Sequence, residues 1–168
     1  WDNILHVRKD LAGHPRPMNT TKTYGATGNN FGHNDQDAIE RFWRHLLAGA
    51  ASIRFHRPGS GLGLNDKAVA CIKAARRLET LIPLWSLEPS MELLSDCDPD
   101  EAYIAADKGR AYAVYFPSGG EVQVDVTEAE GSLDVHWINI DTGDLGAEQT
   151  INGGRRITLT SPDKANWC

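Results

Sequence analysis

The sequence predicts an α/β segment over residues 1–96, followed by an all-β domain over residues 97–168. Helical and strand-like patterns alternate in the first segment, which is typical of βα units around a parallel sheet. Alternating apolar residues, broken by turn residues about every ten positions, dominate the second segment, and this spacing is typical of a small antiparallel sandwich. Residues 83–99 fit neither pattern and are expected to form a connector.

The α/β segment is expected to follow the order helix, strand, helix, strand, helix. A weak helical pattern in residues 1–15 is followed by a β-prone run at residues 16–24. Apolar residues then repeat at helical spacing between Asp35, which can cap the helix, and Gly49, which ends it. A short strand is expected at residues 51–55.

The third helix of this segment is expected to start at Asn65 or Asp66, because either side chain can cap it, and to reach about residue 82. This helix and the one before it can cover only one face of a two-stranded sheet. The other face would then need missing parts of the protein, a second copy or the sandwich, so we expect self-association or a longer chain. The inward residues of the third helix are predicted to be Val69, Ile72, Ala75 and Leu78.

The strands of the sandwich are expected at residues 112–116, 122–126, 133–140 and 156–160. The first two are predicted to form a hairpin, because Pro117-Ser-Gly-Gly120 supplies turn chemistry and glycine reaches positive φ without steric cost. The residues that alternate along this hairpin are Tyr112, Val114, Phe116, Val122, Val124 and Val126.

Composition argues against several classes of partner. A formal net charge of −6 speaks against nucleic acid or an anionic membrane surface as the main partner, and no apolar run approaches the ~20 residues that span a bilayer. Cys71, Cys97 and Cys168 make a poor disulfide framework and show no metal-site spacing. No metal and no cofactor is predicted. The sequence starts without Met or a basic leader and ends inside a strand-like run, so we expect part of a longer protein.

Six motifs resemble one known family: Pro17-Met-Asn-Thr-Thr-Lys22, Arg41-Phe-Trp43, Gly49-Ala-Ala51, Tyr112-Ala-Val-Tyr-Phe-Pro117, Trp137-Ile-Asn-Ile-Asp-Thr-Gly143 and Pro162 with Asn166-Trp167. Together they resemble the C-terminal third of a bacterial glycoside-hydrolase-like family, which joins a (β/α)8 barrel to a C-terminal β-sandwich of the collagen-binding type. The resemblance implies that residues 16–82 are the seventh and eighth βα units of such a barrel. It also implies an extracellular or periplasmic protein that acts on polysaccharide.

The sequence departs from that family at a position that the chemistry needs. Related barrels carry a glutamate at the end of the seventh strand, where this sequence reads Asn19-Thr-Thr-Lys22. Glycosidases use two carboxyl groups that flank the scissile bond, and the second would belong to an earlier strand, outside residues 1–168. This chain is therefore not expected to be catalytic by itself.

Barrel enzymes hold their active groups at the carboxyl ends of the strands. Those ends offer Lys22 and Tyr24 on the first predicted strand and Arg54 and His56 on the second, and we predict these four as substrate-binding residues. Arginine and histidine there can hold a sugar hydroxyl or a carboxylated sugar through hydrogen bonds. The alternative is that Arg54 and Arg57 pair with acidic residues of neighbouring loops and that His56 is a structural loop residue rather than a general base.

Three other features also have a plain structural alternative. Residues 59–63 follow a strand and precede a helix, as a phosphate-binding loop does, but they lack its glycine spacing and are interpreted as a tight turn. The acidic run at residues 88–101 can bind Ca²⁺ or be a solvated connector, and it does not have EF-hand spacing. Trp85, Trp137 and Trp167 can stack on sugars if they are exposed, or pack in the core.

Two functions stay open at this point. The first is a C-terminal fragment of a glycoside-hydrolase-like protein that acts on an extracellular polysaccharide. The second is a non-catalytic carbohydrate- or protein-binding module, in which the sandwich mediates attachment and the first half is structural. An upstream segment with about six more βα units and an Asp/Glu pair on strand ends would favour the first function. A standalone reading frame of this length would favour the second.

Overall fold

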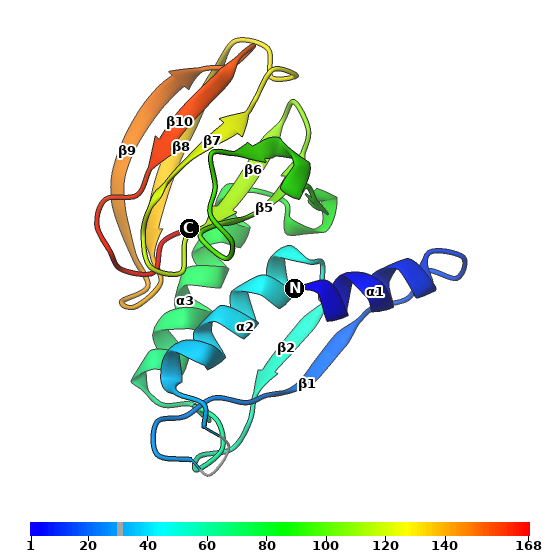
Figure 1. Ribbon diagram of the computed structural model, residues 1–168, viewed down its shortest axis with the longest axis vertical. Helices are drawn as coiled ribbons and strands as arrows, with labels where there is room; N and C mark the ends of the chain where they lie inside the picture. The colour runs from blue at the N-terminus through cyan, green and yellow to red at the C-terminus, as the bar shows by residue number, and fades with distance from the viewer. Residues whose placement is uncertain (30–31) are drawn as a thin grey trace. The chain divides into compact units, whose positions relative to one another are not determined.

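The computed structural model describes residues 1–29 and 32–168 (Figure 1). The chain forms two compact units, Trp1–Val69 and Ala70–Cys168, and the division falls within the helix α3 (Asp66–Leu81). The predicted boundary lies later, between residues 96 and 97. The expected connector belongs to the second unit, since it contributes the short strands β3 (Glu88–Pro89) and β4 (Leu94–Ser95), which pair with strands of that unit.

The first unit contains α1 (Asp2–Leu11), β1 (Asn19–Thr23), α2 (Asp35–Leu47) and β2 (Ser52–Phe55). The strands β1 and β2 are parallel, with Asn19 opposite Ser52, Thr20 opposite Ile53 and Thr23 opposite Phe55. The predicted order of elements is confirmed, and so is the parallel pairing. Residues 30 and 31, in the loop expected before α2, lie outside the described part of the chain.

The helix α2 packs on one face of this two-stranded sheet. The rings of Phe42 and Phe55 stack with centroids 5.1 Å apart, and Trp43 is fully buried. The N-cap of α2 is Asn34, not Asp35 as predicted. The Asn34 side chain accepts a hydrogen bond from the Asp37 N–H at 3.0 Å, and the Asp37 carboxylate accepts one from the Asn34 N–H at 2.6 Å. This capping box satisfies two backbone N–H groups that the helix leaves unpaired.

The helix α3 begins after Asn65, whose side chain accepts from the Ala68 N–H at 3.0 Å, as predicted. Ala75 and Leu78 are buried, but the inward placement of Val69 and Ile72 was wrong, since they are 52% and 36% exposed. The buried stripe runs instead through small residues, which carry little apolar surface and therefore give a weak sequence signal. These small buried residues are Ala68, Ala70, Cys71 and Ala74.

The second unit is built mainly of antiparallel strands. One sheet contains β3, β5 (Tyr103–Asp107) and β6 (Ala111–Tyr115), and a second contains β4, β7 (Glu121–Asp125) and β10 (Arg156–Thr160). The strand β8 (Ser132–Asn139) pairs with β9 (Asp144–Asn152). Two one-turn 3₁₀ helices, Leu84–Ser86 and Met91–Leu93, come directly before β3 and β4.

The predicted hairpin between residues 112 and 126 was wrong. Strand β6 pairs with β5, and β7 pairs with β10 and β4, so the two belong to different sheets. The turn residues between them lead the chain from one sheet to the other. The Gly120 N–H donates a hydrogen bond to the Ser161 hydroxyl oxygen at 2.9 Å. The alternating apolar residues nevertheless share one core, because the inner faces of both sheets meet there.

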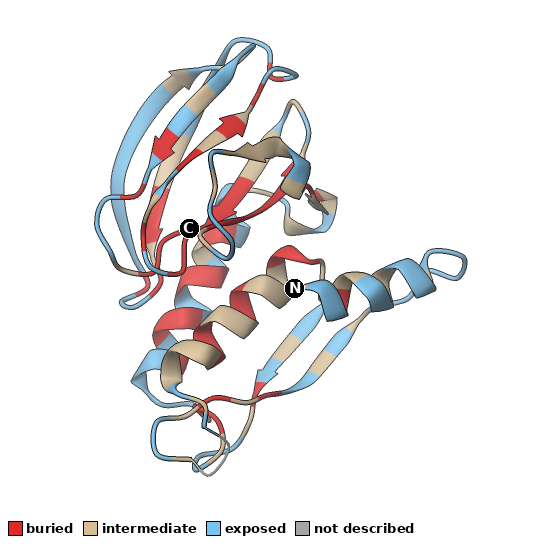
Figure 2. Cartoon of the chain, viewed as in Figure 1, coloured by how far each residue is buried: buried red, intermediate tan, exposed pale blue. Residues whose placement is uncertain are grey.

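Of the three tryptophans that were expected either to stack on sugars or to pack in the core, two lie in the core of the second unit. Trp137 and Trp167 are buried and meet edge to face, with ring centroids 6.2 Å apart, whereas Trp85 is 83% exposed. Figure 2 shows the buried residues in red along β6 and β7, and β9 almost entirely in pale blue. Because β9 has no buried face, its residues lack the alternation that marks a strand, and the sequence did not predict it.

Candidate functional site

The four predicted site residues lie on one face of the β1–β2 sheet. Thr23 and Phe55 are buried on the side that α2 covers. Because side chains alternate along a strand, their sequence neighbours Lys22, Tyr24, Arg54 and His56 lie on the opposite face, at the carboxyl ends of the two strands. The rings of Tyr24 and His56 meet there with centroids 4.7 Å apart and planes inclined by 33°.

Groups from α2 and from the end of β2 fix the backbone around Tyr24. Arg41 of α2 donates from Nη1 to the Tyr24 carbonyl at 2.7 Å, and its Nη2 lies 3.1 Å from His33 Nδ1. The His56 N–H donates to the Thr23 carbonyl at 3.0 Å and so continues the parallel pairing past the end of β2. Sequence reasoning did not give Arg41 this role. The sequence singled out Arg41 only as part of the motif Arg41-Phe-Trp43.

Gly25 lets the chain turn directly after Tyr24. Its N–H donates to the Ser60 carbonyl at 3.2 Å, and its φ is +140°. A Cβ at this position would lie 2.6 Å from the Ala38 backbone nitrogen, so only glycine fits. The first turn of α2 can therefore approach the end of β1 closely, and Tyr24 is held against this packed turn.

His56 is oriented by a hydroxyl group. Its Nδ1 lies 2.5 Å from Ser60 Oγ. Partial burial lowers the pKa of His56 below its ordinary value of 6.5, and the positive charges of Lys22, Arg57 and Arg54 lower this pKa further. The ring is therefore mainly neutral at pH 7 and can accept as well as donate a hydrogen bond.

Three cations surround this ring pair. Lys22, Arg54 and Arg57 are exposed, and within the described residues none of them forms an ion pair within 4.0 Å. The carboxylate of Asp35, the first residue of α2, is engaged elsewhere: it lies 2.8 Å from Lys67 Nζ and accepts from the Thr27 N–H. The hydrogen bond from Lys67 is the main cause that lowers the pKa of Asp35. The open face thus carries uncompensated positive charge.

The glycine-rich loop of residues 59–63 supports His56 by close packing. A Cβ on Gly61 would lie 2.5 Å from the His56 carbonyl oxygen, and Gly63 has φ +57° with its N–H donating to that oxygen at 2.8 Å. These contacts explain two of the glycines as parts of a tight turn, which is how the sequence was interpreted. They also fix the backbone on which the histidine ring is mounted.

The end of β1 presents a cation rather than a carboxyl group on this face. Lys22 occupies the open face at the end of β1, near the position where the resembling family carries a glutamate. Among the described residues, no group of three or more His, Cys, Asp or Glu side chains is placed to hold a metal ion. No helix within the described ranges is long and apolar enough to cross a membrane.

The acidic run near residues 88–101 has individual partners. Glu92 lies 3.0 Å from Lys108 Nζ, and this hydrogen bond is the main cause that lowers the pKa of Glu92. Glu101 accepts from the Asp98 N–H at 2.8 Å, and Asp100 accepts from the Tyr103 hydroxyl. Each of these carboxylates has its own donor, which explains their presence without a shared cation.

Two solved structures share this fold over almost the whole chain. A protein described as "Glycoside hydrolase" superposes with a TM-score of 0.72 at 15% identity, and a glycoside hydrolase family 5 protein from Bacteroides vulgatus ATCC 8482 with a TM-score of 0.70 at 16% identity. Both matches cover 99% of this chain. The fold is glycoside-hydrolase-like.

This glycoside-hydrolase-like chain spans less than half of either neighbour, 44% of the first and 43% of the second. At such low sequence identity the likeness concerns the fold. No family model and no curated protein sequence matches the chain. Its activity must therefore be argued from the site itself.

Proposed function

We propose that the chain is the C-terminal part of a glycoside-hydrolase-like protein that acts on an extracellular polysaccharide, and that its open sheet face binds an acidic sugar. The observation that supports this proposal is the placement of an aromatic pair, Tyr24 and His56, at the ends of two parallel strands, among three cations that form no ion pair with the residues the structure describes. Strand ends are where barrel enzymes hold their substrates. In this proposal β1 and β2 are the last two strands of a barrel, and further βα units or a second copy cover the open face.

Each of the four residues has a role in binding. The Arg54 guanidinium offers paired N–H donors that match the two oxygens of a sugar carboxylate. Lys22 adds a second positive charge, the Tyr24 ring offers an apolar surface to the C–H face of the sugar, and the neutral His56 ring accepts from a hydroxyl group. An exposed site of this kind binds weakly, because water and salt screen its charges.

The proposal includes no catalysis by this chain alone. Glycoside hydrolysis develops positive charge on the sugar ring and needs an acid and a nucleophile or base on opposite sides of the bond. Lys22 would repel that charge. The proposed role is therefore to hold one end of an acidic sugar chain while groups of a complete barrel act on it.

Titration calorimetry with oligogalacturonate and with a neutral cello-oligosaccharide tests the proposal. The acidic ligand should bind, and its affinity should fall as salt rises from 20 to 300 mM, since about three cations contribute. The Arg54→Gln variant should lose about tenfold in affinity. Arg155→Gln, which removes an exposed arginine of the second unit, is the matched control and should bind like the unmodified chain. Equal binding of both sugars would contradict the proposal.

The alternative function, a non-catalytic binding module, is favoured by one observation. Trp85 is 83% exposed, and an exposed tryptophan ring is a suitable platform for a sugar or a protein surface. If Trp85→Ala abolishes binding while Arg54→Gln does not, the second unit is the binding module. The opposite result supports the site on the first unit.

A further inference from the structure

The last residues of the chain lie between two strands of the second unit. Phe116 and Trp167 exchange two backbone hydrogen bonds, at 2.8 and 3.0 Å, and Ile138 and Cys168 exchange two more, at 2.7 and 3.0 Å. Residues 167–168 thus form a short strand that is antiparallel to both β6 and β8. Because one strand fits between them, β6 and β8 are held about two strand spacings apart, about 9.6 Å.

Beyond Cys168 the facing edges of β6 and β8 have no strand between them. Strand β6 uses its other edge to pair with β5, and β8 uses its other edge to pair with β9. Since hydrogen-bonding direction alternates along an antiparallel strand, Tyr112 and Val114 of β6 and Asp134 and His136 of β8 direct their backbone groups into this space. Within residues 1–29 and 32–168, no strand pairs with these groups.

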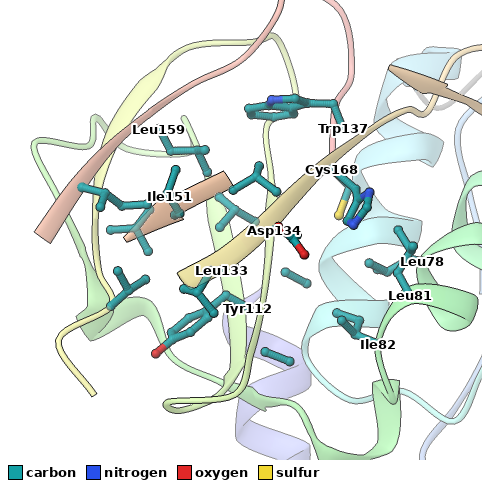
Figure 3. Close-up of a pocket in the computed structure, with 18 of the residues that line it drawn as sticks. Leu78, Leu81, Ile82, Tyr112, Leu133, Asp134, Trp137, Ile151, Leu159 and Cys168 are labelled. Carbon is teal, nitrogen blue, oxygen red and sulfur yellow. The ribbon is translucent and has the colours of Figure 1, made fainter. Parts of the chain in front are cut away.

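The space belongs to a cavity of about 430 Å³. Figure 3 shows Leu159 and Ile151 on one side of it and Leu78, Leu81 and Ile82 of the α3 region on the other. All the residues that line it belong to the second unit, Ala70–Cys168. Apolar residues above and below, with two backbone edges at the sides, are the surroundings of a buried central strand.

We infer that this slot is a strand-acceptor site, and that its occupant is an extended apolar segment that continues in line from Cys168. The register follows from the bonds already made. The Trp167 side chain lies in the core, so the first added residue would face the core between Val114 and Trp137, which also lie there. The second would share the face of Cys168, toward Leu81 and Ile82. Every position would be buried, so the segment is apolar on both faces.

The backbone edges favour a strand over a small apolar ligand. A small ligand can fill the volume, but it leaves the N–H and C=O groups of both edges without partners, which is costly in an apolar space. A strand satisfies these groups and places alternate side chains on both sides. Trp167 and Cys168 already hold the start of this strand in position, so a covalent continuation avoids the entropy cost of capturing a separate chain.

Extended variants of the chain test this inference. One variant adds Val-Ile-Val-Val-Val-Thr after Cys168, and its matched control adds Val-Pro-Val-Pro-Val-Thr. The prolines fall on the two positions whose N–H groups would bond to His136 and Asp134, and proline has no N–H. The first tail should raise Tm by about 5 °C or more, because several apolar residues become buried. It should also slow amide exchange at Val114 and His136 at least about tenfold. The proline tail should do neither.

Other results would overturn the inference. An equal rise in Tm with both tails would mean apolar contact without strand pairing, and no rise with either would mean that the slot does not take a strand. In a third experiment, the segment Val-Ile-Val-Val-Val-Thr is added to the unextended chain as a free acetylated peptide. If the free peptide protects Val114 and His136 while the fused tail does not, the slot takes a strand from a separate chain, and the continuation from Cys168 is refuted.

Discussion

The rings of Tyr24 and His56 meet with centroids 4.7 Å apart, although 32 positions separate them in the sequence. They meet because each residue directly follows one of two adjacent parallel strands, and because Thr23 and Phe55 point to the opposite face, beneath α2. This relationship brings Lys22 and Arg54 to the same surface. It is the basis of the proposed sugar site.

Acidic-sugar binding should strengthen as the pH falls from 7 to 5. The pKa of His56 lies below 6.5, so the ring is neutral at pH 7 and gains a positive charge as the pH drops through that lowered pKa. A sugar carboxylate stays ionised over this range, since carboxyl groups titrate near pH 3.5. Calorimetry at low salt should show an increase of about two- to fivefold in affinity. An unchanged increase in His56→Gln would show that another group is responsible.

Replacement of the aromatic residue that joins α2 to the sheet should be strongly destabilising. Phe42 is buried and stacks on Phe55, so Phe42→Ala should lower the free energy of unfolding by about 3–5 kcal/mol. Val69→Ala is the control, because Val69 is 52% exposed, and it should change stability by less than about 0.5 kcal/mol. Urea unfolding measures both. A larger loss in Val69→Ala than in Phe42→Ala would show that α3 presents a different face.

Two glycines with positive φ should respond differently to alanine. Gly28 has φ +85° with open space around it, so Gly28→Ala should cost only the backbone term, about 1–2 kcal/mol. Gly25→Ala should cost at least about 2 kcal/mol more, since its Cβ would collide with Ala38. Thermal unfolding of the two variants gives the comparison. Similar values would mean that α2 can move away from the end of β1 without penalty.

The chain alone should not hydrolyse glycosides. The end of β1 presents Lys22 rather than a carboxylate, and one carboxyl group without a partner would not suffice in any case. A panel of aryl glycosides and polyuronates, assayed for reducing ends, should show no turnover above buffer. Turnover that disappears in Arg54→Gln but persists in Arg155→Gln would place a reaction at this face.

The sequence predicted the parts of the fold whose periodicity is strong. Helices α2 and α3 and the burial of Val122, Val124 and Val126 follow from apolar spacing, and the parallel pair follows from the alternation of helices and strands. The pairing of β6 could not be predicted in this way. Ala113 and Tyr115 are buried as well as Val114, so both faces of β6 are apolar and no alternation identifies its partner strand. A glycine-rich turn, moreover, suits a crossing between sheets as well as a hairpin.

The candidate site was predictable only in part. Strand ends could be located, and with them Lys22, Tyr24, Arg54 and His56. The hydrogen bond from Arg41 to the Tyr24 carbonyl could not be predicted. It depends on how α2 lies against the end of β1, and Tyr24 stands 17 positions before Arg41 in the chain. The Ser60 hydroxyl beside His56 was likewise hidden, since it results from the turn that Gly61 and Gly63 allow.

Chemical-shift mapping of the labelled chain with an oligogalacturonate tests the central claim most directly. Because the four proposed residues share one sheet face, the account predicts that the backbone amide signals of Lys22, Tyr24, Arg54 and His56 shift together with one dissociation constant. The shifts should vanish in Arg54→Gln and remain in Arg155→Gln. Shifts centred on Trp85, or none at ligand concentrations of about 10 mM, far above the range of weak binding, would contradict it.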